Sequence, residues 1–245
     1  MNTLSQALLA PFFFAYFLVA PIDGHRAHNT VNKPAANVVT AKRNAISQKA
    51  ILLYDSLKLD SFGLTRKAFE YAYRGYTYLQ EKGKLANSAV LSICDFSKSS
   101  RVKRFFVVDV EQAKLLISTY VAHGRKSGAE YARLFSNRTN SHMSSLGFYV
   151  TETPYVGSNG LSLRIAGLEK GFNDKADRRN IVIHGSEYVG EDFIKDNPFT
   201  GRSYGCPAVP ATEIDEVINT IKGGSCLFIY HPTKNYITHS RILNS

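Results

Sequence analysis

Cysteines and long apolar runs are scarce in this 245-residue chain, and each shortage excludes a class of protein. Three cysteines are too few for a disulfide-dense small domain, and their odd number leaves at least one thiol unpaired within the chain. The only apolar run, residues 8–20, has 13 residues, whereas a helix needs roughly 20 to span a bilayer. The sequence is therefore not that of a polytopic membrane protein. With 44% hydrophobic residues, it is not a wholly disordered chain either.

Acidic residues are also in the minority: 30 Lys and Arg face 20 Asp and Glu, which gives a formal net charge of +10. Never more than two Lys or Arg follow one another, and RNP, helix-turn-helix and zinc-finger signatures are absent. We therefore expect no nucleic-acid partner and interpret the charge as a general attraction to an anionic polymer or surface. C-x-x-C and H-E-x-x-H motifs are missing too, which predicts that the chain binds no metal.

The apolar run at residues 8–20 is typical of the hydrophobic region of a signal peptide. Two details differ from that pattern: no Lys or Arg precedes the run, and Pro21 follows the cleavage position at Ala20. The alternative is a buried amphipathic helix. We predict export, with residues 1–20 as a signal peptide or a membrane-proximal segment that contacts the membrane only if it stays uncleaved. Residues 21–40, rich in Asn, His, Ala and Pro, are predicted to form a linker.

The pattern of apolar residues is typical of helices in the first part of the chain and of strands after residue 84. Apolar residues spaced by three and four positions predict helices over residues 41–59 and 65–81, a helical hairpin within residues 41–84 with a packing role. From residue 85 onward, short β-branched and aromatic runs predict a β-sandwich or barrel-like domain that extends to residue 245. The predicted strands cover residues 89–96, 104–110, 115–122, 147–156, 161–165, 181–184 and 226–230, with one later helix at 211–221.

Two long polar segments, residues 124–145 and 185–205, interrupt the predicted strands. Loops of this length are uncommon inside a compact domain unless they have a function, so the first is interpreted either as a cover that excludes water from a site or as a mobile surface loop. Glu169 and Asn173 either shape a groove or lie on a solvated turn. Cys94 and Cys226 are expected to be buried, reduced thiols.

A histidine and a cysteine frame the second polar segment. His184 ends a short apolar strand and is followed by Gly185, while Cys206 follows Gly205 and precedes a proline. An imidazole can take the proton of a thiol and leave a thiolate ready for attack, and the amides of Gly205 and Cys206 can face a developing oxyanion. The second ring nitrogen of the imidazole needs a partner, for which we expect a backbone carbonyl such as that of Gly185. The alternative is a core cysteine and a strand-end histidine that never meet.

Several motifs, in order, resemble the YkuD-type L,D-transpeptidase catalytic domain, in its murein L,D-transpeptidase branch. Residues 202–208 read RSYGCPA, residues 183–185 read IHG, and residues 167–173 read GLEKGFN; residues 121–124 and 141–149 also match. The resemblance covers roughly residues 88–232. It implies a mainly β, sandwich-like or barrel-like fold, here preceded by the helical hairpin, with Cys206 as nucleophile and His184 as base. Gly205 and Gly185 would complete the catalytic set, and no cofactor is required.

Family members are bacterial cell-wall enzymes outside the cytoplasmic membrane, so the resemblance implies a protein of the periplasm or cell envelope, which we expect to be a monomer. The implied reaction is acyl transfer between peptidoglycan stem peptides, through a thioester, to give 3→3 cross-links. The rival predictions are an L,D-carboxypeptidase or endopeptidase that uses water as acceptor, and a non-catalytic wall-binding module.

The sequence departs from the better-studied branch near the cysteine. Tyr204 stands where that branch has a histidine, and Pro207-Ala208 replace the residues that lead to its usual arginine. Substrate carboxylates must then be bound elsewhere, and guanidinium groups suit them. We predict that the following residues bind substrate: Arg202, Ser203, Tyr204, Arg164 and His123.

Overall fold

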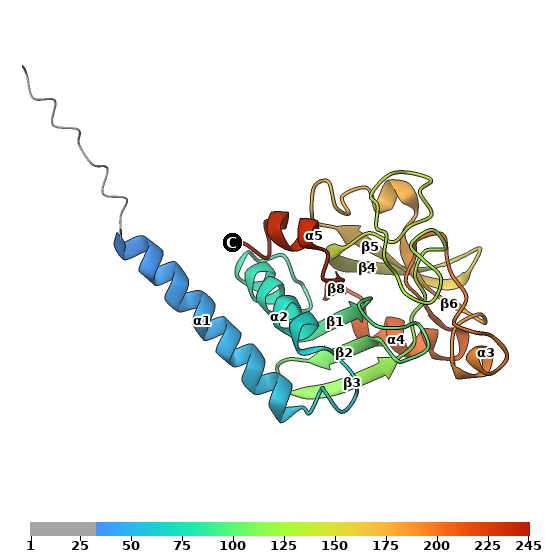
Figure 1. The fold of residues 1–245 in the computed structure, drawn as a ribbon, viewed down its shortest axis with the longest axis horizontal. Coiled ribbons are helices and arrows are strands. Elements are labelled where there is room, and N and C mark those ends of the chain that lie inside the picture. The colour runs from blue at the N-terminus through green and yellow to red at the C-terminus, as the bar shows by residue number, and fades with distance from the viewer. Residues whose placement is uncertain (1–32) are drawn as a thin grey trace, which may run out of the picture.

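Two helices open the part of the chain that this computed structural model describes, residues 33–245. They are α1, Lys33–Ser56, and α2, Arg66–Glu81, which confirm the predicted helical pair. Because α1 begins at Lys33, the last part of the predicted linker is helical. The predicted export segment at residues 1–20 and the linker up to residue 32 lie outside the described residues. In Figure 1, α1 extends beyond the body of the molecule, whereas α2 lies along the sheet.

Eight strands form one sheet, in the order β3-β2-β1-β8-β4-β5-β6-β7. Their bounds are β1 Val90–Asp95, β2 Phe105–Asp109, β3 Lys114–Thr119, β4 Gly147–Gly157, β5 Gly160–Gly167, β6 Val182–Ser186, β7 Ala208–Pro210 and β8 Cys226–Tyr230. The sheet is a nearly closed barrel, because the chain after β3 returns to β7: the Ala122 amide donates to the Ala208 carbonyl oxygen at 2.8 Å. The mainly β, barrel-like fold is thus confirmed.

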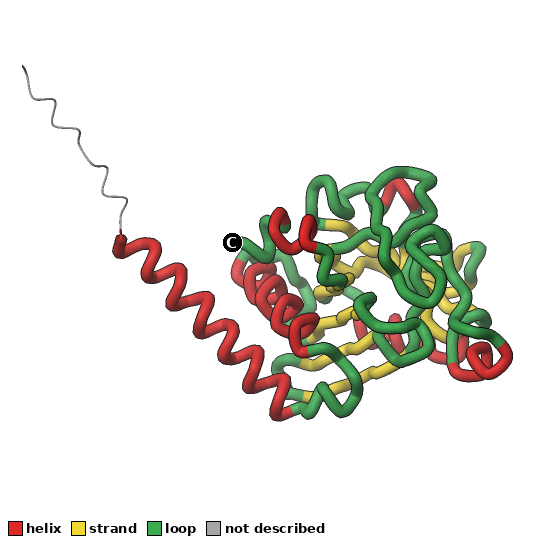
Figure 2. The backbone as a smooth tube through the Cα atoms, viewed as in Figure 1, coloured by secondary structure: helices red, strands yellow, loops and turns green. Residues whose placement is uncertain are grey.

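The remaining helices are short. α4, Ile214–Ile221, lies within the predicted helix and buries the apolar side chains of its stripe. The helices α3, Glu191–Asp196, and α5, Lys234–His239, and the strand β7 were not predicted, and single 3-10 turns lie at η1, Asp177–Arg179, and η2, Ala211–Glu213. Figure 2 shows that the loops gather on the side of the molecule away from α1, where Figure 1 places β6 and α3.

Helix α2 belongs to the same hydrophobic core as the sheet. An ideal Cβ on Gly75 would lie 1.9 Å from Phe148 Cζ, so only glycine permits this approach of α2 to β4. At the start of the helix, the Asp95 carboxylate accepts hydrogen bonds from the Thr65 amide at 3.1 Å and the Thr65 hydroxyl at 2.8 Å. Since Thr65 is also the N-cap of α2, the end of β1 fixes where the helix begins. The predicted boundary at residue 84 therefore does not separate two cores.

The central strands are buried along their whole length: every residue of β1, β2 and β8 is inaccessible or nearly so. Continuous burial means that both faces of these strands are covered. On β8, Phe228 stacks on Phe148 with ring centroids 4.1 Å apart, and Tyr230 stacks on Tyr71 of α2. Within residues 33–245, no helix combines the length and the apolar character needed to cross a membrane.

Candidate active site

The pairing of β6 with β7 brings the predicted histidine and cysteine into one site. These strands are parallel, with His184 opposite Ala208 and Gly185 opposite Val209. Cys206 lies just before β7, so it continues the register beside the start of β6. Neighbouring strands are separated by roughly 4.8 Å, so these two segments lie close together although the 21 residues 185–205 separate them in the sequence. His184 and Cys206 line the same cavity.

The imidazole of His184 is oriented by its own strand. Its Nδ1 lies 2.9 Å from the Gly185 carbonyl oxygen, and a carbonyl can only accept, so Nδ1 carries the proton. When the ring acts as a general base, this tautomer leaves the Nε2 lone pair to take the proton. The side chain is only 6% exposed, so its orientation is also held by packing. The expected carbonyl partner is thus present in the structure.

Cys206 is a neutral thiol in this arrangement. Its Sγ donates to the Asn180 carbonyl oxygen at 3.5 Å, and the structure contains no hydrogen bond between this thiol and the His184 ring. Burial raises the pKa of the Cys206 thiol, although the Val182 amide and the Arg179 guanidinium act in the opposite direction. The structure thus shows no contact that would mark a preformed ion pair between Cys206 and His184.

A turn built on Ser203 shapes the backbone around the cysteine. The Ser203 hydroxyl accepts from the Gly205 amide at 3.0 Å and donates to the Cys206 carbonyl oxygen at 2.6 Å. The Gly205 amide is thus engaged and cannot face an oxyanion in this conformation, contrary to the expectation. Among the described residues, neither the Tyr204 nor the Cys206 amide donates to a backbone carbonyl, and the Cys206 amide hydrogen-bonds its own thiol and lowers the pKa of that thiol. These two amides are the backbone donors left for developing negative charge.

Gly205 must be glycine for two reasons. Its φ of +130° lies in a region that side-chain-bearing residues avoid, and an ideal Cβ would lie 2.7 Å from the Met143 carbonyl oxygen. Met143 belongs to the first long polar segment, residues 124–145. This segment packs directly against the cysteine turn, and the Ser144 hydroxyl donates to the Gly205 carbonyl oxygen at 3.2 Å.

Arg179, at the end of η1, is a site residue that the sequence analysis missed. Its guanidinium donates to the carbonyl oxygens of Ser136, at 2.8 Å, and Met143, at 2.5 Å, and to the hydroxyls of Ser141 and Ser145. One cation thus binds four groups of the segment that packs against Gly205. Burial lowers the pKa of Arg179, yet a guanidinium remains charged at neutral pH. The only signal in the sequence is its position two residues before the strand that ends in His184.

The cavity around Cys206 has a volume of about 780 Å³ and is positively charged. Three arginines line it, Arg125, Arg179 and Arg202, and no carboxylate among the described residues does. The second long segment supplies much of the wall, including Tyr188 and part of α3, so both long loops contribute to the site. The following residues line the cavity as well: Asn159, Asn180, Ile181, Phe193, Asn197, Pro198, Phe199, Thr200, Gly201 and Ser203.

Two of the predicted substrate-binding residues project into this cavity. Tyr204 is 64% exposed, and its ring lies beside the Arg125 guanidinium, 5.5 Å from ring centroid to Cζ. Arg202 is exposed and donates to the Gly128 carbonyl oxygen at 3.2 Å, so it is held at the rim. Ser203 lines the cavity, but its hydroxyl is occupied by the turn described above.

Arg164 does not line this cavity: its guanidinium lies over the Tyr155 ring, 4.6 Å from the centroid, on the hairpin of β4 and β5. Neither does His123, which is fully buried. Its Nδ1 accepts from Arg104 Nη2 at 2.8 Å, while Nε2 faces the Gly128 carbonyl oxygen. Burial, and after it the charge of Arg104, lowers the pKa of His123 to about 3, so the ring is neutral. The structure brings neither of these predicted substrate-binding residues into the cavity, because exposure and partners depend on tertiary packing.

Although His123 is not a groove residue, its backbone positions the cysteine turn. The His123 carbonyl oxygen accepts from the Ser203 amide at 3.0 Å, and the Arg125 amide donates to the Ser203 carbonyl oxygen at 2.7 Å. Arg104, which is also fully buried, donates to the Val121 carbonyl oxygen through Nε and Nη2. Burial lowers the pKa of Arg104 to about 9. A buried cation thus holds the segment against which the cysteine turn pairs.

The remaining predicted residues are structural. Glu169 is buried and accepts hydrogen bonds from the Phe148 amide, at 2.9 Å, and from the Tyr236 hydroxyl, at 2.7 Å, so it does not lie on a solvated turn. Cys94 and Cys226 are free and buried, as expected; Cys226 pairs with Leu91 across the strands, three positions away from Cys94. Among residues 33–245, no group of three His, Cys, Asp or Glu side chains is placed to hold a metal ion.

Comparison with known proteins places this site in a family. The sequence model of the L,D-transpeptidase catalytic domain matches residues 61–230, a match that includes α2 and all eight strands of the barrel as well as both site residues. No curated protein matches the chain.

Solved structures of L,D-transpeptidases resemble it at low identity. One from Mycobacterium smegmatis is 10% identical with a TM-score of 0.36, over 58% of this chain and 59% of that one. One from Xylanimonas cellulosilytica is 13% identical with a TM-score of 0.34, over 76% and 93%. One from Stackebrandtia nassauensis is 12% identical with a TM-score of 0.34, over 67% of each chain. The match thus spans 59% of the length of the M. smegmatis protein. Because the family match covers more than half of the sequence, this chain belongs to the L,D-transpeptidase catalytic-domain family.

Proposed function

We propose that this protein is a cysteine acyltransferase that joins peptidoglycan stem peptides through a thioester and forms 3→3 cross-links. The observation that supports it most is the shared cavity: Cys206 and a His184 ring with its Nε2 lone pair available lie on one cationic surface. A reactive thiol, a base in the correct tautomer and a binding surface for carboxylates are the parts that this chemistry needs.

In the first half of the reaction, His184 Nε2 takes the Sγ proton as Cys206 attacks the carbonyl carbon of the third stem residue. The C–S bond forms and the carbonyl oxygen becomes an oxyanion, which accepts hydrogen bonds from the Tyr204 and Cys206 amides. When the oxyanion collapses, the C–N bond to the terminal D-alanine breaks. The imidazolium of His184 then protonates the departing amine, and a thioester remains on Cys206.

In the second half, the amine of another stem attacks the thioester. His184 takes a proton from this amine, the new C–N bond forms, and the C–S bond breaks to release the Cys206 thiolate. The proton returns from His184 to the sulfur, which restores the neutral thiol of the resting structure. Residues 124–145, held against the cysteine turn by Arg179, cover the site and limit the access of water to the thioester.

Substrate recognition rests on charge. Stem peptides carry free carboxylates, and the cavity offers the guanidinium groups of Arg125 and Arg202 at its rim with no competing carboxylate among the described residues. Guanidinium binds carboxylate with two parallel hydrogen bonds, which fixes orientation as well as affinity. These two arginines take the part that the sequence analysis gave to Arg202 and Arg164.

The proposed substrate also implies a location. Peptidoglycan is assembled outside the cytoplasmic membrane, so an enzyme acting on stem peptides works as an exported protein of the cell envelope. The net charge of +10 favours its association with an anionic wall. We propose that it acts there as a monomer, because His184, Cys206 and the arginines of the cavity all come from one chain.

Mass spectrometry of purified disaccharide-tetrapeptide incubated with the enzyme tests the proposal. Two stems joined with loss of one D-alanine are the expected product, and Cys206→Ala should give none. Cys94→Ala is the matched control, because it removes a buried thiol far from the cavity and should keep activity. Tripeptide alone would mean that water is the acceptor and would make the protein a carboxypeptidase. Unchanged substrate with all three proteins would overturn the acyl-transfer proposal.

A further inference from the structure

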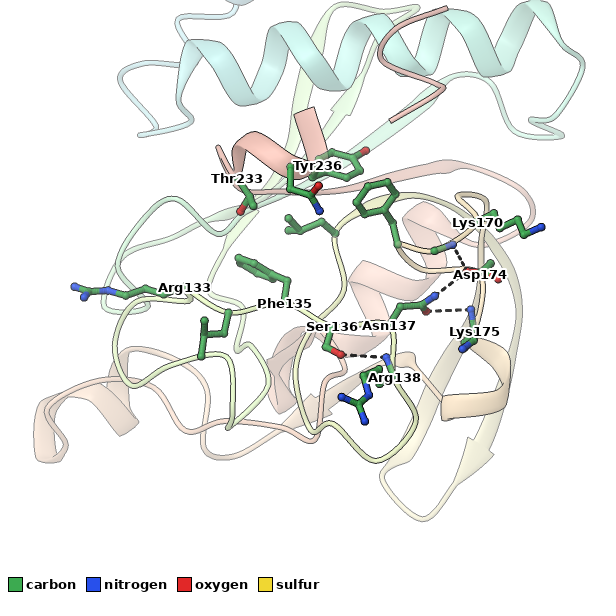
Figure 3. A pocket seen from close by; sticks show the side chains of 15 residues that line it. Arg133, Phe135, Ser136, Asn137, Arg138, Lys170, Asp174, Lys175, Thr233 and Tyr236 are labelled. Carbon is green, nitrogen blue, oxygen red and sulfur yellow. Dashed lines mark hydrogen bonds between the residues drawn. The ribbon is translucent and has the colours of Figure 1, made fainter. Parts of the chain in front are cut away.

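A second cavity, of about 700 Å³, lies on another part of the 124–145 segment and shares no lining residue with the catalytic cavity. Figure 3 shows it between Phe135, Ser136 and Asn137 on one side and Thr233 and Tyr236 on the other. The other residues that line it are Arg133, Leu134, Arg138, Leu146, Lys170, Gly171, Phe172, Asp174, Lys175 and Asn235. Nothing in the mechanism above uses this cavity.

The cavity combines aromatic rings with neutral polar groups. Phe135 and Phe172 are half-buried, and Phe172 packs edge-on against Tyr236 with centroids 5.1 Å apart. Hydroxyl and amide groups, such as those of Thr233 and Asn235, alternate with the rings along the wall. A concave surface of this kind, apolar with a few hydrogen-bonding groups, is the usual composition of a ligand site.

The rim of the cavity is strongly basic. Arg133, Arg138, Lys170 and Lys175 are all exposed, and none forms an ion pair with a described residue. The single carboxylate, that of Asp174, is occupied: it accepts from Asn137 Nδ2 at 2.7 Å and from the Gly171 amide at 2.7 Å. Four unpaired cations around one cavity favour an anionic ligand.

A chain of contacts joins this cavity to the cysteine. Ser136 lines the cavity, and its carbonyl oxygen accepts from Arg179 at 2.8 Å. The other arm of the same guanidinium reaches the Met143 carbonyl oxygen, beside Gly205. One loop therefore forms part of this cavity and also packs against Gly205, next to Cys206. A polymer with one segment in the catalytic cavity has its neighbouring segments close to such a surface.

We propose that this second cavity binds another carboxylate-bearing peptide segment of the same wall polymer, a stem that is not the one reacting at Cys206. The inference rests on the proposed function for the identity of the polymer. The aromatic rings pack against the apolar parts of the peptide, and the rim cations attract its carboxylates. Binding there holds the substrate close to the catalytic cavity and raises its effective concentration.

The test uses Cys206→Ala, which cannot turn over substrate, and follows its backbone amides by NMR as disaccharide-tripeptide is added. We expect saturable shifts at Ser136, Asn137 and Asn235, in addition to those at the catalytic cavity. Adding Lys170→Gln and Lys175→Gln should weaken binding at these amides by about fivefold, since rim charges each contribute modestly. The matched control is Lys103→Gln, an exposed lysine outside both cavities, which should leave the affinity within about twofold.

Three results would overturn the inference: no shift at these amides, an equal loss of affinity with Lys103→Gln, or equal shifts from inorganic phosphate at the same ionic strength. Tighter binding of a single-stranded DNA oligonucleotide than of the tripeptide would also overturn it, in favour of a nucleic-acid site. The cross-linking assay of the wild-type enzyme is read separately. Shifts without cross-linking would reject the proposed function and keep the site, whereas cross-linking without shifts would reject the site alone.

Discussion

The substitution Gly205→Ala tests whether the cysteine turn is held as tightly as the structure indicates. The new methyl group would lie 2.7 Å from the Met143 carbonyl oxygen and 3.1 Å from both Arg179 Nη2 and Ile181 Cδ1. The Met143 oxygen and Ile181 are not free to move, because the oxygen accepts a hydrogen bond from Arg179 and Ile181 is buried. The backbone must in addition keep a φ of +130°.

Two effects lower the free energy of unfolding of Gly205→Ala. Holding alanine in this region of φ costs about 1–3 kcal/mol. Forcing a methyl group into a filled space adds roughly 1–3 kcal/mol. Gly83→Ala separates the two, because Gly83 also has a positive φ, +62°, but an ideal Cβ there meets nothing within 4 Å. That control should cost only about 1–2 kcal/mol, the penalty of a left-handed alanine.

Urea unfolding followed by tyrosine fluorescence measures both variants, since the chain has 14 tyrosines and no tryptophan. We expect Gly205→Ala to lower the free energy of unfolding by about 2 kcal/mol more than Gly83→Ala does. Native-state alkylation adds a local readout, because Cys94 and Cys226 are buried and Cys206 alone reacts. Its rate should change in Gly205→Ala and stay the same in Gly83→Ala. Equal stability of the two variants, with unchanged alkylation, would refute the tight contact between the cysteine turn and residues 124–145.

Three further substitutions test other parts of the structure. Arg179→Gln removes the charge that lowers the pKa of the Cys206 thiol, so the pH profile of its alkylation should move to higher pH; an unmoved profile would contradict this role. His123 has a pKa of about 3 when folded and near 6.5 when unfolded, so the free energy of unfolding should fall by about 2 kcal/mol between pH 7.5 and pH 5. Urea unfolding at the two pH values measures this difference, and His123→Asn should remove it. Gly75→Ala would place its Cβ 1.9 Å from the Phe148 ring and should destabilise the fold by about 2–4 kcal/mol, as measured by thermal unfolding. A Tm within about 2 °C of that of the wild type would contradict this close contact.

The sequence predicted most reliably those elements whose pattern is local. Helix α2 was expected at residues 65–81 and is found at Arg66–Glu81, because its apolar stripe faces the sheet. Near the start of α1, Val38 is 68% exposed and so adds nothing to an apolar stripe from which that part of the helix could be predicted. β7 has three residues and ends in a proline, and its identity as a strand comes from pairing with β6. A strand defined by its partner leaves little trace in its own sequence.

In the candidate site, too, local patterns could be predicted from the sequence and long-range contacts could not. Cys206, His184 and the carbonyl of Gly185 follow from a local motif and could be named from it, whereas the roles of more distant residues could not. Arg179 acts through groups up to 43 residues away in the chain, and nothing in its neighbourhood indicates which carbonyls it binds. His123 was assigned to the groove because it ends a strand before a glycine, as His184 does, but a buried arginine lies beside its ring.

Two arginines, the buried Arg104 and the half-buried Arg179, explain why the cysteine turn is fixed although the turn itself contains little that could hold it. On one side, Arg104 binds the Val121 carbonyl, and the strand extension that follows pairs with Ser203. On the other side, Arg179 binds Met143, which lies against Gly205. Neither guanidinium forms an ion pair with a described carboxylate, and each donates hydrogen bonds to backbone carbonyl oxygens instead. Because these arginines bind carbonyl groups, they fix the backbone of the cysteine turn and not merely side chains, and the proposed chemistry depends on the backbone of that turn.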